Sequence, residues 1–295
     1  PEGEVLLTWE ELPGTYPDGT PFSLRRPIFD VILSNGEPLP EHIERSLRLP
    51  PPVIGLGLLE AISEETILER SDPDDADGDG ISGRPNMVWN SVTARPEMGR
   101  FGHKATSRNL REQAVRAYFE DMGVSNPDMQ GVDPAPDIDE ETVELTTFYT
   151  QTLAVPLRLD TDDPDVPAGE RIFNDIGCEQ CHRSVVRTGV HELPEVSDQV
   201  IQPFTDMLLH DMGEGLADHR PDHSATGTEW RTAPLWAIGL TRTVSGVQNF
   251  LHDGRARTLE EAILWHDGEA RSAKDNFMGL SKTEREKLIK FLNAL

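Results

Sequence analysis

The chain has 295 residues, of which 53 are acidic and 27 are basic, so its formal net charge is −26. Such a field repels nucleic acid and anionic membranes and favours a basic partner, which excludes nucleic-acid binding as a function. The hydrophobic fraction is 36%, and no apolar run approaches the roughly 18 residues needed to cross a bilayer, so we expect no membrane span. The length allows one large domain or two ordinary ones.

The first part of the chain predicts strands and then a short helix. Residues 5–9 and 28–33 are rich in β-branched and aromatic side chains, and a turn sequence, Tyr-Pro-Asp-Gly-Thr, lies between them at 16–20. Consecutive prolines at 50–52 interrupt the chain before an amphipathic helix, which we expect over 58–68.

An aspartate-rich block follows that helix and predicts a calcium site. Asp75, Asp77, Asp79 and Gly80 stand at positions 1, 3, 5 and 6 of an EF-hand-type loop. This spacing directs three carboxylates at one hard cation. Position 12, where an acidic residue is usual, is Asn86, which we take as a further candidate ligand. The alternative is a solvated acidic turn without an ion.

Two more helices are predicted, over 109–122 and 140–153, from the spacing of their apolar positions. An acidic, proline-containing segment follows the second helix and is the best candidate for a domain boundary. We therefore expect a loop-rich region with the calcium-binding-type loop and helices over residues 1–165, and a c-type cytochrome domain over residues 166–295.

The only two cysteines lie in the pentapeptide Cys178-Glu-Gln-Cys181-His182. The C-x-x-C-H pattern is the attachment signature of a c-type haem, in which both thiols bond to the porphyrin and the histidine becomes an iron ligand. Three alternatives stay open. A structural zinc site normally needs a second ligand pair, a thioredoxin-like pair needs a βαβ context, and a simple disulfide leaves His182 without a role.

The helices around this motif indicate the fold of the second domain. A helix-like run over 168–176 precedes the motif, and Thr258 and Ser281 each begin a capping box that opens a later helix. Gly169 and Phe173 resemble the N-terminal helix of a class I cytochrome c, where the glycine permits a close helix crossing. We therefore expect a mainly α fold with irregular loops and a few N-terminal strands, ending in a class I cytochrome c-like helical domain.

Motifs over nearly the whole chain resemble one protein family. Residues 230–236 and 250–263 are similar to the C-terminal haem domain of bacterial di-haem cytochrome c peroxidases. More closely, the chain resembles the related di-haem "thiol oxidoreductase" family of unassigned function. The other segments that carry this resemblance are Pro51 to Ile62, the aspartate-rich loop to Asn86, Arg100 to Ala105, Leu208 to Gly213 and the C-terminal third.

The resemblance implies a second iron ligand. In the peroxidases, a Tyr-x-His-x-Gly motif precedes the distal methionine of the electron-transfer haem by a fixed interval, and the same interval from His252 leads to His266. We expect bis-histidine ligation by His182 and His266, with Met207 or Met212 as the alternative. An iron with two imidazole ligands has no open position, so it relays electrons and does not activate peroxide.

Two further residues, Arg231 and His252, are expected beside the haem as propionate or supporting contacts. A guanidinium such as that of Arg231 can bind a carboxylate through two hydrogen bonds. The chain departs from the family in one respect: the family carries two C-x-x-C-H motifs, and this sequence has one. It is therefore either a fragment whose N-terminal haem domain is missing or a mono-haem relative. The peroxide chemistry would belong to the missing haem.

These observations predict an electron-transfer domain of a di-haem peroxidase-like oxidoreductase, with one covalent haem c and calcium as cofactors. Its partner would be a redox protein, favoured by charge to be basic, or the N-terminal haem domain of the same protein. Haem c is attached outside the cytoplasm, and no signal peptide opens the chain, so we expect a mature or trimmed periplasmic protein. The alternatives are a non-catalytic interaction module stabilised by haem and calcium, and a mono-haem enzyme with an open iron site.

Overall fold

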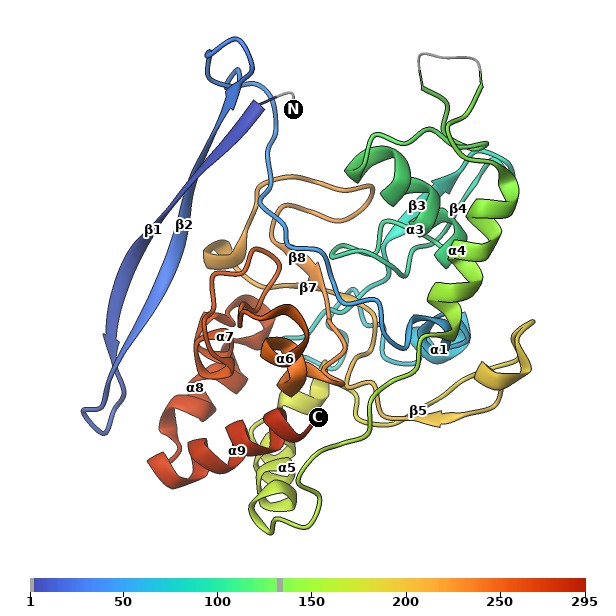
Figure 1. Cartoon of the computed structure of the whole chain (residues 1–295). Coiled ribbons are helices and arrows are strands. Elements are labelled where there is room, and N and C mark those ends of the chain that lie inside the picture. Colours follow the sequence, from blue (N-terminus) through green and yellow to red (C-terminus); the bar gives the residue numbers. More distant parts are fainter. Residues whose placement is uncertain (1–2, 132–134) are drawn as a thin grey trace.

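The computed structural model describes residues 3–131 and 135–295. It is 33% helical and 18% strand, and its strands form small antiparallel sheets of two strands each (Figure 1). The expectation of a mainly α fold is therefore wrong, and the C-terminal part does not show a class I cytochrome c fold. The 23 prolines and 24 glycines limit helix length, and the longest α-helices have 13 residues. None of the helices in these residues is both long and apolar enough to span a membrane.

The N-terminal strands form one long hairpin. Strand β1 (Gly3–Thr15) pairs with β2 (Pro21–Leu33), from Gly3 opposite Leu33 to Thr15 opposite Pro21. The hairpin extends along one side of the molecule (Figure 1). At its turn, the buried Tyr16 donates a hydrogen bond of 2.6 Å to Glu260 Oε1, which fixes this end of the hairpin to the C-terminal helices.

The single helix predicted over 58–68 is two short helices, α1 (Leu56–Glu60) and α2 (Glu64–Leu68). The Ser63 side chain accepts a hydrogen bond from Thr66 N, which caps α2 and begins a new helix. The acidic loop follows, and then a hairpin of β3 (Met87–Asn90) and β4 (Arg95–Met98).

The next two helices were predicted nearly correctly. Helix α3 (Leu110–Arg116) begins at its cap Asn109 and continues into a π-helical turn, η1 (Ala117–Asp121). Helix α4 (Glu140–Thr152) begins at Asp139, whose side chain accepts from Thr142 N. The wider turn of η1 is the only part that the 3.6-residue spacing did not indicate.

The remaining elements follow α4 in the chain, and the C-x-x-C-H motif begins in one of them, η2 (Cys178–Gln180). The helical ones are α5 (Asp165–Asp175), η2 (Cys178–Gln180), η3 (Pro194–Val196), η4 (Glu214–Leu216), η5 (Ile238–Leu240), α6 (Thr241–Ser245), α7 (Leu259–Trp265), η6 (Gly268–Ala270), α8 (Arg271–Gly279) and α9 (Lys282–Ala294). The strands form two pairs, β5 (Val186–Arg187) with β6 (Val200–Ile201) and β7 (Leu209–Asp211) with β8 (Glu229–Arg231). The capping box predicted at Ser281 is present at the start of α9. At Thr258 the prediction holds in part: its side chain caps α7, but the Glu261 carboxylate accepts from Arg257 N and does not complete the box.

Helix α5 crosses α9 in close contact (Figure 1). A Cβ atom added at Gly169 would lie 2.1 Å from Lys287 O, so only glycine permits this approach. One turn further along α5, Phe173 packs edge-on against Phe291 of α9 with ring centroids 5.5 Å apart. The crossing fixes the end of α5, and therefore the start of the C-x-x-C-H motif, against the core.

The described residues form two hydrophobic clusters. The first combines α5, α7 and α9 with Tyr16 of the hairpin turn, and the second combines α1 and α2 with Leu110, Val186 and Trp236. Each cluster therefore includes residues from both sides of position 165, where the sequence predicts a domain boundary. That boundary stays a prediction.

Candidate functional site

The C-x-x-C-H motif begins where α5 ends. Gly177 has φ 95°, a left-handed conformation that lets the chain leave the helix and enter the short turn η2. Cys178 and Cys181 are both free thiols and are half-buried. Burial raises the pKa of the Cys178 thiol to about 12 and also raises the pKa of Cys181. With both pKa values raised, the two thiols stay protonated at pH 7.

The imidazole of His182 points one nitrogen at the backbone. Its Nδ1 lies 2.9 Å from Phe204 O, so Nδ1 carries the proton and donates to that carbonyl. Burial lowers the pKa of His182 to about 4, which keeps the ring neutral at pH 7. The lone pair of Nε2 is then available to a metal ion, the arrangement found in proteins that bind metals through histidine.

His266 repeats this arrangement from the other side. It caps the C-terminus of α7, and its Nδ1 lies 2.7 Å from Ala262 O. Burial lowers the pKa of His266 as well. The His182 and His266 rings are 6.5 Å apart between centroids and are tilted by 50°. Two neutral imidazoles, each with Nδ1 bound to a carbonyl, therefore lie next to one another.

The two methionines considered as alternatives pack in different hydrophobic clusters. Met207 is buried in the second cluster, with residues such as Leu59 and Ile62. Met212 packs at the edge of the first cluster, and its backbone N donates to Thr228 O. Of the candidate sixth ligands His266, Met207 and Met212, His266 is the one whose ring is recorded beside that of His182 in the described residues.

In the described residues, the guanidinium of Arg231 contacts backbone carbonyls and forms no ion pair. Its Nε donates to Gly102 O at 3.0 Å and its Nη1 to Thr232 O at 3.2 Å, and it forms no ion pair with a carboxylate in residues 3–131 and 135–295. Burial lowers the pKa of Arg231 to about 10. A cation in this condition is suited to an added carboxylate, such as a haem propionate.

His252 is placed differently. It stacks on Trp230 with ring centroids 3.7 Å apart and an interplanar angle of 10°, and its Nε2 lies 3.5 Å from Asp253 Oδ2. Burial lowers the pKa of His252 to about 3. These contacts give His252 a packing role beside Trp230, and the structure does not bring it into contact with the ring of His182 or His266.

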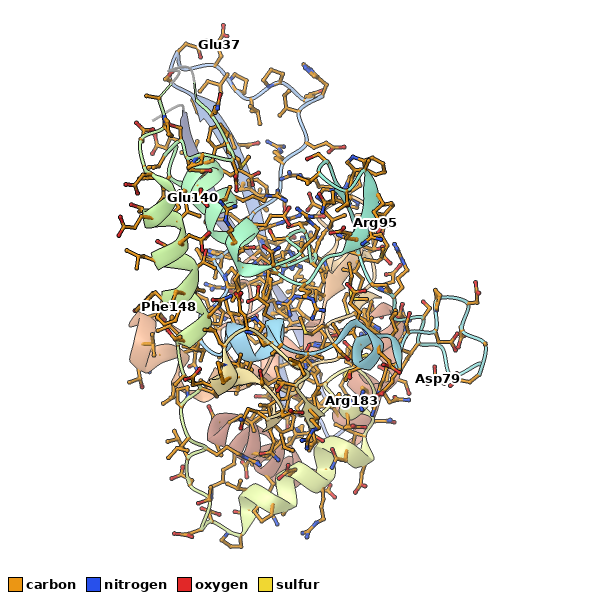
Figure 2. All side chains as sticks on the ribbon, turned by 90° about the vertical axis from the view of Figure 1, so that its right-hand side faces the viewer. Glu37, Asp79, Arg95, Glu140, Phe148 and Arg183 are labelled. Carbon is orange, nitrogen blue, oxygen red and sulfur yellow. The ribbon has the colours of Figure 1, made fainter. Side chains whose placement is uncertain are left out.

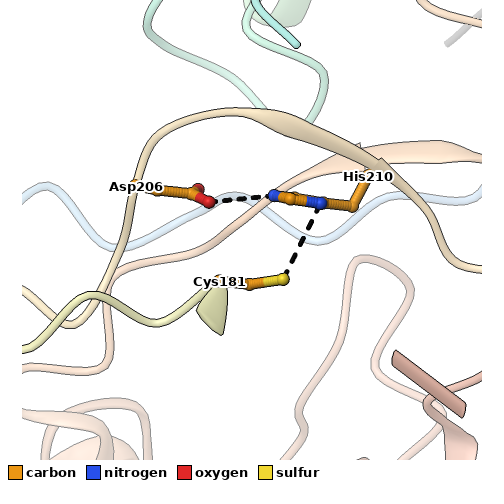
Figure 3. Close-up of side chains that lie close together, drawn as sticks. All are labelled: Cys181, Asp206 and His210. Carbon is orange, nitrogen blue, oxygen red and sulfur yellow. Dashed lines mark hydrogen bonds and ion pairs between the residues drawn. The ribbon is translucent and has the colours of Figure 1, made fainter. Parts of the chain in front are cut away.

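A charged cluster that the sequence did not reveal lies beside Cys181. His210 Nε2 is 2.9 Å from Asp206 Oδ2, and His210 Nδ1 is 2.6 Å from Glu269 Oε2. Cys181 Sγ is 3.7 Å from the same Nδ1 (Figure 3). Burial opposes the charged imidazole, but the hydrogen bonds to Asp206, Cys181 and Glu269 outweigh it and hold the pKa of His210 well above its usual value. His210 belongs to the motif at 208–213, but nothing in the sequence pairs it with Glu269, 59 residues away.

The acidic loop projects from the body of the protein, with Asp79 near its tip (Figure 2). The carboxylates of Asp72, Asp75 and Asp77 lie within 4.8 Å of one another, so Asp72, which the EF-hand pattern omits, joins two predicted ligands. Asp79 instead accepts a hydrogen bond of 3.4 Å from Gln180 Nε2, which connects the loop to the C-x-x-C-H motif.

The predicted ligand Asn86 is not in this loop. Its Nδ2 donates to Lys104 O at 2.6 Å and to Asp222 O at 3.0 Å, and its Oδ1 accepts from the backbone N and the hydroxyl of Ser224. These four bonds use the full capacity of a side-chain amide. Asn86 is fully buried, so the tertiary packing assigns it to the core and not to a cation.

The profile of a protein family described as "Di-haem oxidoreductase, putative peroxidase" matches residues 2–131 and 128–295. These two stretches include nearly the whole chain. The chain belongs to the di-haem oxidoreductase family. No curated protein and no solved structure matches it at a significant level.

The donor set of this chain fits a haem. Two imidazoles that bind one metal ion from opposite sides, at about 2 Å for each nitrogen, have ring centroids roughly 6 Å apart, and the observed separation is 6.5 Å. The free thiols of Cys178 and Cys181 stand beside His182 in the chain. Next to His266, the buried indole N–H of Trp265 has no hydrogen-bond partner in the described residues, so one polar donor is left for a further group.

Proposed function

We propose that this member of the di-haem oxidoreductase family binds one haem c covalently through Cys178 and Cys181, with His182 and His266 as the iron ligands. The observation that supports this most is the pair of imidazoles 6.5 Å apart, each with Nδ1 bonded to a backbone carbonyl. Bound there, the haem supplies reversible transfer of one electron. Arg231 would hold a propionate, since its charge has no partner in the described residues.

The function that follows is electron relay within a peroxidase-like system. Six-coordinate iron leaves no position for peroxide, so the relay would pass electrons to or from a second redox centre. Because this chain has a net charge of −26, a basic redox protein is the favoured partner. Because haem c is attached outside the cytoplasm, the proposed attachment implies a periplasmic protein.

Counting haems tests this proposal directly. The expected result is an intact mass equal to the chain plus one haem, and a pyridine-haemochrome spectrum of the c type. Oxidised and reduced spectra should be low-spin, and the ferrous protein should not bind carbon monoxide. A protein without covalent haem, or rapid binding of carbon monoxide to the ferrous form, contradicts it.

We also propose that the acidic loop binds calcium. Calcium prefers oxygen ligands, and the carboxylates of Asp72, Asp75 and Asp77 would supply them. The hydrogen bond that Asp79 accepts from Gln180 connects the loop to the haem-attachment segment.

The expected result is calorimetric binding of one Ca²⁺ and a higher unfolding temperature with calcium, since a ligand bound only by the native state stabilises it. The double variant D75N/D77N should lose both effects because it removes two ligand charges. The matched control is D162N, which removes an exposed carboxylate of another acidic segment. Equal calcium binding by D75N/D77N and D162N would refute the site.

A further inference from the structure

Asp206, His210 and Glu269 form a buried cluster whose three side chains share one dissociable proton. Both ring nitrogens of His210 face carboxylate oxygens, at 2.9 Å and 2.6 Å. Ionised carboxylates can only accept hydrogen bonds, so either the imidazole carries both protons or one carboxyl group is protonated. In each case the three groups share one dissociable proton.

This cluster is buried and rigid. His210 is 2% exposed and Asp206 is 6% exposed. Glu269 accepts further hydrogen bonds from the Ser82 hydroxyl at 2.8 Å and from Asp211 N at 3.1 Å, while Asp206 Oδ1 accepts from Leu208 N. Charges fixed in this way, with little water around them, act strongly on their neighbours.

The imidazole of His210 contacts side chains from three segments of the chain. Asp206 precedes β7, Glu269 lies in η6, and Cys181 follows η2. On another side, Gly83 faces the ring; a Cβ there would lie 2.6 Å from His210 Cε1, so the chain leaves room for the imidazole and adds no charge. The titratable groups that contact His210 are therefore two carboxyls and one sulfur.

The sulfur connects the cluster to the redox centre. Cys181 Sγ is 3.7 Å from His210 Nδ1. If the proposed function is correct, this sulfur is bonded to the porphyrin, so the shared proton lies beside the haem edge. An electron added to the iron then attracts the proton more strongly through a short, poorly solvated path.

We propose that Asp206, His210 and Glu269 form a proton-binding site coupled to the oxidation state of the haem iron. The cluster takes up one proton from solvent as one electron arrives from a protein donor, and it releases the proton on reoxidation. This inference rests on the proposed function. A metal ion held by Cys181, Asp206 and His210 is the competing interpretation, but both imidazole nitrogens already face carboxylates and have no free lone pair for a metal.

The test is the midpoint potential of the haem-loaded chain, measured over neutral and alkaline pH. Reduction raises the proton affinity of the cluster, so the potential should fall as pH rises through the range where the proton is lost. The limit is about 59 mV per tenfold change in proton concentration, the value for one proton per electron. Two carboxylates next to the imidazole favour its charged form, so the fall belongs on the alkaline side.

Two variants and one control make the test specific. E269Q and D206N each remove one negative charge beside His210, so both should raise the potential at pH 7 and move its fall to lower pH. E269Q keeps an acceptor for Ser82, which protects the fold if D206N is unstable. The control, E60Q, alters a half-buried carboxylate that lies 3.3 Å from His191 Nε2 in a different part of the molecule, and it should follow the wild type.

Redox-difference infrared spectra give a second readout, in which carboxyl or imidazole bands of the wild type disappear in E269Q. Potentials that do not change with pH, or curves of E269Q and D206N that coincide with those of the wild type and E60Q, would overturn the inference. The haem count and the spin state are measured first. A chain without low-spin haem c disproves the proposed function, and with it this inference; a normal haem with unchanged potentials disproves this inference alone.

Discussion

Replacing His266 by Gly is expected to convert the iron from six-coordinate and low-spin to an open site. The substitution removes the imidazole that faces His182 at 6.5 Å and leaves in place the two cysteines proposed to hold the haem. The ferrous variant should bind carbon monoxide rapidly, whereas the wild type should not. Added imidazole should restore the low-spin spectrum, because it fills the position that the side chain left. Absorption spectra with and without carbon monoxide measure all three effects.

The matched control for this variant is H219G. His219 is an exposed histidine whose side chain is 70% accessible, and its φ of 57° suits glycine. Its spectrum should be that of the wild type. If H266G also keeps the wild-type spectrum, the sixth ligand is another residue, and the same experiment on Met207 and Met212 would identify it.

Gly169→Ala is expected to destabilise the protein by about 1–3 kcal/mol, the usual cost of overpacking a closed contact. The added Cβ would lie 2.1 Å from Lys287 O and 2.7 Å from Phe291 Cβ, so α5 and α9 must separate. Because the C-x-x-C-H motif begins where α5 ends, the haem spectrum should also broaden. Urea unfolding of the haem-loaded chain gives the change in free energy.

A second helical glycine provides the comparison. Gly279 is the last residue of α8, is exposed, and has no atom within 4 Å of an added Cβ. Gly279→Ala should be neutral or stabilising by up to about 1 kcal/mol, since alanine is the better helix former. Equal stability of the two variants would show that the α5–α9 contact is looser than the structure indicates.

Sequence patterns succeeded where the signal was local. The hairpin at the N-terminus, α4, and the capping box at Ser281 follow from alternation, spacing and cap chemistry within a few residues. The prediction of one helix over 58–68 was wrong because Ser63 caps a second helix in the middle of an apolar pattern that looks continuous. The mainly α fold class was wrong because the pairs β3–β4, β5–β6 and β7–β8 were not predicted; their strands of two to four residues are too short to show a clear alternation.

In the candidate calcium site, too, local spacing indicated some residues, whereas the surroundings of another depended on distant segments. Asp75 and Asp77 come together in the acidic loop as their spacing predicts, because the ligands are two residues apart. Asn86, the last of the predicted calcium ligands, is directed into the core by Ser224 and Lys104, which are far away in the chain. Position in a loop pattern therefore indicated which carboxylates lie close together, but it could not show the hydrogen-bond partners that Asn86 takes from other segments.

The sequence by itself determined the prediction of haem attachment, because Cys178, Cys181 and His182 lie within five residues in the C-x-x-C-H pattern. Only the tertiary structure decided which side chains meet them. The packing of α7 places His266 beside His182, and Glu269 reaches His210 across 59 residues of chain. A pattern in the sequence records spacing along the chain, whereas these contacts depend on how the buried faces of α5, α7 and α9 pack.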